Sequence, residues 1–126
     1  MNIAFLCVLI AGALPLACAV AAKWGFREFD NHNPREWMAR QTGFRARANA
    51  AQSNSFEAFP FFAVGVVLAT LTNADVQRVD ACALVFVLSR VAFIACYLAD
   101  RATLRSCFWL LGLLSALALY GAALGH

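Results

Sequence analysis

The stretch RANAAQSNSFEAFPFF, residues 47–62, is polar over its first turns and apolar towards its end. The apolar part continues as AVGVVLATL, so residues 47–72 are long enough to cross the hydrocarbon core of a bilayer as a helix. An arginine, an asparagine and a glutamate are costly there unless they face the protein interior or a wet cavity. The stretch therefore predicts a membrane-spanning helix with one polar face turned towards the protein.

The composition extends this prediction to the whole chain. Hydrophobic residues make up 63% of the 126 residues and charged residues only 13%, which excludes an ordinary soluble domain. We predict an all-α fold, an integral membrane four-helix bundle forming one domain over residues 1–126. Its spans are expected at residues 2–22, 47–72, 76–99 and 105–124. The first is expected to be a retained helix, because MNIAFL lacks the basic start of a signal peptide.

Basic residues predict the orientation of the spans. The first connection and its edge hold Lys23, Arg27, Arg35, Arg40, Arg45 and Arg47, the third connection holds Arg101 and Arg105, and only Arg78 lies near the second. The positive-inside rule therefore puts the first and third connections in the cytoplasm and both termini on the non-cytoplasmic side. The first connection also carries five aromatic residues suited to the headgroup level: Trp24, Phe26, Phe29, Trp37 and Phe44.

Polar residues inside the spans recur at helical spacing. Arg47, Asn54 and Glu57 share one face of the second span, and Arg90 and Tyr97 share a face of the third. An unpaired buried carboxylate is costly, so we expect Glu57 to contact Arg90 or a backbone donor near Asn54. This face is either a structural ion pair alone or a pocket for an anionic ligand. In the second case the candidate ligand residues are Arg47, Asn54, Arg101 and Arg105.

Other kinds of site have little support in the sequence. The five cysteines form no CxxC pair and the two histidines stand alone, so no metal site is expected and the cysteines are interpreted as small buried hydrophobes. No nucleic-acid binding is expected, because membrane orientation already explains the basic residues. One intramembrane glutamate and one arginine, without an inverted repeat, make a transporter improbable.

Two segments resemble one membrane family. NSFEAFPFF, residues 54–62, is similar to the Asn-x-x-Glu-x-x-Pro signature on the second helix of the MAPEG family, the membrane-associated proteins in eicosanoid and glutathione metabolism. SRVAFIACYLADRATLRSCFW, residues 89–109, is similar to the third-helix pattern of that family, in which an arginine and then a tyrosine precede a basic loop. With the four-span topology, the resemblance covers roughly the whole chain.

The resemblance implies a homotrimer in the bilayer, of the bacterial type and so in the inner membrane, with glutathione held between neighbouring subunits at the cytoplasmic side. Residues matching the ligand-binding positions are Asn54, Glu57, Arg90 and Tyr97. Arg105 corresponds to the arginine that activates the thiol, with Arg101 as the alternative. Ala50 stands where glutathione-binding members place an arginine, and Arg47 is the candidate substitute for it.

Two functions follow from the resemblance and stay open. The first is a glutathione-dependent transferase or peroxidase acting on lipophilic electrophiles. The second is a non-catalytic scaffold or accessory subunit that binds other membrane protein subunits, which Ala50 favours. For the second function, the fourth span offers a close-packing surface of small residues: Gly112, Ser115, Ala116, Gly121 and Ala122.

Overall fold

The chain folds as an all-helical bundle. A computed structural model describes residues 2–24 and 29–125, and within them there are five helices and no strand. The helices are α1 (Asn2–Lys23), α2 (Pro34–Ala39), α3 (Gly43–Leu71), α4 (Val76–Leu98) and α5 (Ala102–Leu124). All except α2 are long and apolar enough to cross a membrane. The predicted all-α fold with four spans is therefore confirmed.

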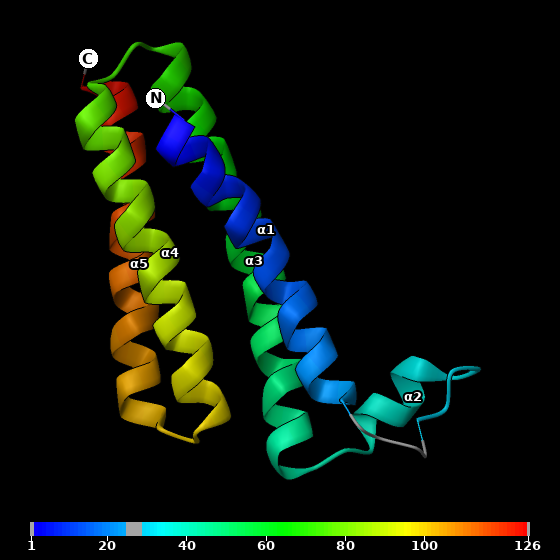
Figure 1. Cartoon of the computed structure of the whole chain (residues 1–126). Helices are drawn as coiled ribbons and strands as arrows, with labels where there is room; N and C mark the ends of the chain where they lie inside the picture. The colour runs from blue at the N-terminus through cyan, green and yellow to red at the C-terminus, as the bar shows by residue number, and fades with distance from the viewer. Residues whose placement is uncertain (1, 25–28, 126) are drawn as a thin grey trace.

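The four long helices pack as two pairs (Figure 1). Helix α1 lies along α3, and α4 lies along α5, with further contacts between the pairs. The pairs lie close together at the end that holds both termini and the α3–α4 turn, which we call the termini end. They diverge towards the opposite end, which holds α2 and the α4–α5 turn and which we call the α2 end.

Apolar side chains join the two pairs in the half of the bundle nearer the termini end. Phe62 of α3 stacks on Phe86 of α4, with ring centroids 3.9 Å apart and planes 5° apart. Val66 of α3 and Leu119 of α5 are fully buried beside them in the same apolar cluster. The outer faces of the helices are also apolar, as expected for surfaces in contact with lipid tails.

Two helix boundaries differ from the predicted spans, and a side-chain cap starts α4. Helix α3 begins at Gly43 and α5 at Ala102, about one turn before the expected positions, because their polar first turns precede the apolar segments. Asp75 is the N-cap of α4, and its carboxylate accepts a hydrogen bond from the backbone amide of Arg78 at 3.3 Å. This contact satisfies one of the free amides of the first turn.

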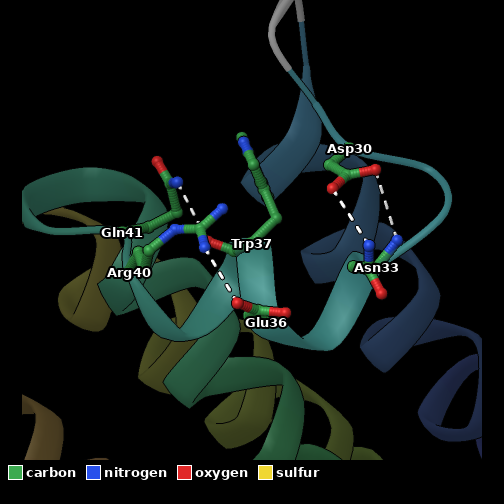
Figure 2. Close-up of polar contacts among 6 residues, drawn as sticks. All are labelled: Asp30, Asn33, Glu36, Trp37, Arg40 and Gln41. Atoms are coloured by element: carbon green, nitrogen blue, oxygen red, sulfur yellow. Dashed lines mark hydrogen bonds and ion pairs between the residues drawn. The ribbon is translucent and has the colours of Figure 1, made fainter.

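The first connection contains the short helix α2, which the sequence analysis did not predict. Its polar contacts are local: the carboxylate of Asp30 accepts from the side chain and backbone of Asn33, and Glu36 pairs with Arg40 at 3.2 Å (Figure 2). Trp37 is 4% exposed and shares a buried cluster with Ala22 of α1 and Ala48 of α3, so it anchors α2 to the bundle. Its ring also packs edge-on against Phe29.

The burial of Trp37 removes its ring from contact with the headgroups, for which the sequence analysis considered it suited. Trp24 and Phe44, at 76% and 46% exposure, remain available to the membrane interface. Phe26 and Arg27 lie outside the described residues.

The small residues of α5 pack mainly inside the subunit, which corrects their predicted role as a surface for a partner helix. Gly112, Ser115, Ala116 and Ala122 are buried. A Cβ atom at Gly112 would lie 3.0 Å from the hydroxyl of Ser89, so the small residues there allow α4 and α5 to approach closely.

Candidate functional site

A buried arginine connects α4 to α3. Arg90 is only 3% exposed, and its Nη2 donates to Oδ1 of Asn54 at 2.7 Å and to the hydroxyl of Ser55 at 3.2 Å. The guanidinium also lies 4.2 Å from the ring centroid of Phe93, one turn further along α4. A charge this far from water needs such partners, and here a neutral amide, a hydroxyl and an aromatic face supply them.

Glu57 does not form the expected contact with Arg90 or with a backbone donor. Its side chain is exposed and has no hydrogen bond or ion pair among the described residues. The reason is rotational: Glu57 is ~60° around α3 from Asn54, so Asn54 faces α4 while Glu57 faces a cavity. The carboxylate is therefore left for another partner, and a neutral pair of acceptors holds Arg90.

A second arginine is held by an aromatic ring at the α2 end. Arg105, in the first turn of α5, lies 4.4 Å above the ring centroid of Tyr97. Tyr97 packs edge-on against Phe93 with ring centroids 5.5 Å apart. Two rings of α4 in edge-on contact thus separate two guanidinium groups, and they fix the positions of both cations on one side of the bundle.

Two adjoining cavities border this arrangement. The smaller, of about 200 Å³, is polar at its rim and is lined by Asn54, Phe93, Tyr97, Arg105, Ser106 and Trp109. The larger, of about 280 Å³, is mostly apolar and is lined by Asn54, Glu57, Ala58, Phe61, Phe86, Arg90, Trp109, Leu113 and Ala116. Asn54 and Trp109 line both. A polar compartment beside Arg105 therefore opens next to an apolar compartment inside the membrane span.

Arg47 is engaged elsewhere. Its guanidinium donates from Nε and Nη2 to the carbonyl of Leu98 at 3.4 and 3.3 Å, at the carboxyl end of α4. Arg45 makes the equivalent contact with α1, donating to the carbonyls of Ala22 and Trp24 at 2.8 and 3.1 Å. Carbonyls in the last turn lack partners within the helix, and the negative end of the helix dipole also favours a cation. Both arginines therefore cap neighbouring helices.

Arg101 is the second residue that stands apart from the cavities. It is exposed at the N-cap of α5 and belongs to neither lining. The structure therefore brings together Asn54, Glu57, Arg90, Tyr97 and Arg105, and leaves out Arg47 and Arg101.

A third cavity lies on the opposite face of α3. It has a volume of about 430 Å³, opens at the α2 end, and is lined by Lys23, Pro34, Arg35, Met38, Ala39, Asn49, Gln52 and Ser53. At ~100° per residue, Asn49 and Ser53 lie roughly 100–180° around α3 from Asn54 and Ala58. The chain thus presents a basic polar surface on one side of α3 and the arginine-bearing cavities on another.

Three residues of the site escaped the sequence analysis, although each had a signal. Ser55 lies on the buried stripe of α3 with Ala48, Ala51 and Phe62, where a hydroxyl indicates a polar partner across the interface. Phe93 lies between Arg90 and Tyr97 at helical spacing, and Trp109 lies one turn after Arg105.

The family model that matches the sequence of the chain covers residues 3–125 and is that of the MAPEG family. The chain belongs to the MAPEG family. The match covers nearly the whole chain, so the resemblance seen in residues 54–62 and 89–109 is confirmed. No curated protein matches the chain in sequence. Membership supports an integral membrane protein with a glutathione-related function, because MAPEG proteins generally use glutathione. MAPEG proteins are also generally trimers.

Proposed function

We propose that the protein is a glutathione-dependent transferase or peroxidase that acts on lipophilic electrophiles within the membrane. The observation that carries this proposal is the pair of adjoining cavities. The polar one has Arg105 fixed over Tyr97, and the apolar one begins at the shared wall of Asn54 and Trp109. A water-soluble thiol and a lipid-soluble acceptor need two such compartments in contact.

The residues around the cavities suit the functional groups of glutathione. Arg105 and Arg90 can each receive an anionic group, Glu57 can accept from the amino group, and the amide of Asn54 can bind peptide groups. The exposed Glu57 supports this assignment, because a carboxylate in a membrane span needs a partner that the described part of the subunit does not provide. Glutathione supplies the thiol, so no side chain of the protein has to be the nucleophile.

The role of Arg105 is electrostatic. A guanidinium favours the thiolate over the thiol, and about one pKa unit of lowering gives almost ten times more thiolate at neutral pH. Tyr97 keeps the guanidinium in position and limits the volume in which the sulfur can move. Arg105 borders the polar cavity and Arg101 does not, so we assign the thiol-activating role to Arg105.

The experiment is turnover of a chromogenic aryl halide with glutathione, in detergent or in proteoliposomes. The Arg105→Ala variant should lose about tenfold or more in kcat/KM, because it loses the group that stabilises the thiolate. Arg101→Ala removes the same charge from the same helix start and should keep most of the activity. Equal losses in both variants, or no loss in either, would contradict the assignment of Arg105.

We further propose that the site is completed by a second subunit in a homotrimer. Each of the two cavities is at or below the lower end of the size range of ligand pockets. Ala50 also stands where glutathione-binding members place an arginine, so another cation is needed for the second carboxylate of glutathione. The cavity on the opposite face of α3 holds Lys23 and Arg35, and in a closed ring it can face the arginine-bearing cavities of a neighbour.

Native mass spectrometry in mild detergent tests the assembly. A trimer is expected, and Lys23→Ala should weaken glutathione binding while leaving the trimer intact. A monomer as the only species would contradict both the assembly and a shared site.

In the proposed orientation the α2 end is cytoplasmic, in the inner membrane of a bacterium, where glutathione is available to the polar cavity. A cysteine placed at Asn31 should then resist a membrane-impermeant thiol reagent in intact cells, and one at Asp75 should react. Wild-type protein, with its five native cysteines, sets the background. Labelling of position 31 from outside the cell would contradict this orientation and indicate the opposite one.

The alternative function, a non-catalytic scaffold or accessory subunit, has one observation in its favour. Arg47, the candidate substitute for an arginine at Ala50, is bound to the carbonyl of Leu98. Removing a cation from the ligand set weakens the case for glutathione. The same turnover experiment separates the two, because a scaffold has no wild-type turnover to lose.

A further inference from the structure

A tyrosine of α5 joins α3 where the apolar cavity ends. The hydroxyl of Tyr120 donates to the backbone carbonyl of Phe61 at 2.8 Å, and its ring stacks on the ring of Phe61 with centroids 4.5 Å apart and planes 22° apart. Phe61 itself lines the apolar cavity. One turn further along α3, Gly65 leaves room for the tyrosine: a Cβ atom there would lie 3.0 Å from Cε2 of Tyr120.

The lining residues give the direction and the length of the cavity. Helices α3 and α5 run in the same direction (Figure 1), and the lining extends from Asn54 to Phe61 on the first and from Trp109 to Ala116 on the second. Seven residues of helix correspond to ~10 Å. The polar compartment lies at the start of this distance, and Tyr120 lies one turn beyond its end.

We propose that the contact between Phe61 and Tyr120 closes the apolar cavity and limits the length of the electrophile that the protein accepts. The substrate class is then an electrophile whose apolar group is aryl or short alkyl, up to ~10 Å long, rather than a long acyl chain. That the occupant is an electrophile rests on the proposed function; the closure rests on the contact between the two rings.

Partition of the substrate makes this limit effective. A chain that enters from lipid gains little apolar burial, because lipid tails are as apolar as the cavity wall. A chain longer than the cavity therefore has no compensation for separating the two stacked rings and breaking the hydrogen bond. Short chains are accepted and long chains are excluded, even though both are soluble in the membrane.

The closure can be tested by binding alone, without glutathione and without turnover. The probes are N-alkyl-2,4-dinitroanilines of increasing chain length, which are unreactive towards thiols and quench tryptophan fluorescence. Trp109 lines the cavity and serves as the reporter, and Trp109→Phe gives the background from the other tryptophans. Affinities are expressed relative to the probe concentration in the detergent or lipid phase.

Wild-type protein should bind short-chain probes with similar affinity and lose about tenfold or more once the chain exceeds ~10 Å. In Phe61→Ala and Tyr120→Ala the long-chain probes should bind as well as the short ones. Tyr120→Phe keeps the ring and should keep the limit. Phe56→Ala is the matched control, because Phe56 is a half-exposed phenylalanine of α3 that lines neither cavity of the site.

Binding of the short probes shows that each variant is folded. The proposal is overturned if wild-type protein binds all chain lengths equally, if no probe quenches Trp109, or if the limit is unchanged in both alanine variants. If wild-type protein shows the length limit but no turnover with glutathione, the proposed function alone is contradicted.

Discussion

The two ends of the bundle are held together by different forces. In the half nearer the termini end, Phe62, Val66 and Leu119 are fully buried and the ring of Phe62 stacks on that of Phe86, so the main connection between the two helix pairs there is apolar. Towards the α2 end, the main connection between α3 and α4 is polar, through Arg90 and its hydrogen bonds to Asn54 and Ser55. The helix pairs diverge in that direction (Figure 1).

This difference explains where a site can form. The close-packed side chains of the apolar cluster around Phe62 offer no specific partner to a polar ligand. Buried arginines, in contrast, need polar or anionic partners. The helices diverge in the same region, and the space between them forms cavities that a ligand can enter. We therefore expect stability to depend mainly on the apolar cluster and the proposed ligand binding mainly on the cavities towards the α2 end, so substitutions in the two regions should have separable effects.

The largest loss of stability is expected from Phe62→Ala at the termini end. Truncation of a fully buried phenylalanine removes its packing against Phe86 and leaves a cavity, which costs about 3–5 kcal/mol. Unfolding in a denaturing detergent, monitored by circular dichroism, measures the effect. Phe56→Ala, on the exposed side of the same helix, should cost far less. An equal cost would mean that the buried cluster around Phe62 contributes no more to stability than the exposed face of α3.

An intermediate effect is expected at the polar connection. Asn54→Ala leaves Arg90 with one of its two hydrogen-bond acceptors, which should cost about 1–3 kcal/mol in the same unfolding assay. Arg90→Met removes the charge together with its need for partners, so it should cost less than Asn54→Ala while still abolishing glutathione binding. A fully stable Asn54→Ala variant would show that the polar contact does not join the two helices.

A smaller effect is expected from the cap at the end of α4. Arg47→Ala removes the donor to the carbonyl of Leu98 and should cost about 0.5–1 kcal/mol. Arg40→Ala breaks only the exposed pair with Glu36 and should cost about 0.3–0.5 kcal/mol. If Arg47→Ala instead preserves stability and weakens glutathione binding, Arg47 is a ligand residue and not a cap.

Much of the fold can be predicted from the sequence, but the contact partners of long side chains cannot. Span number and type depend on the length of apolar segments, a one-dimensional property. The spacing of Arg90 and Tyr97 likewise predicted that they share one side of α4. Arg47 and Leu98, in contrast, are 51 residues apart, and a flexible arginine can reach a carbonyl of another helix that no helical periodicity reveals.

The failure at Glu57 has a similar origin. Periodicity placed Glu57 and Asn54 on the same broad face, but ~60° of rotation decides which of the two meets Arg90. The contact of Tyr120 with the backbone of Phe61 depends on the packing of α5 against α3, so it too could be seen only in the structure. Most of the candidate site residues come from the family resemblance, and the structure gives the contacts between them.

Glutathione binding to the purified protein tests the central claim most directly. Glutathione is titrated into detergent-solubilised protein at neutral pH, and the ultraviolet absorbance of the thiolate is followed. We predict a saturable rise for wild-type protein that is largely lost in Arg105→Ala and retained in Arg101→Ala, since only Arg105 borders the polar cavity. No rise at millimolar glutathione, together with no turnover, would contradict the enzyme proposal and favour the scaffold.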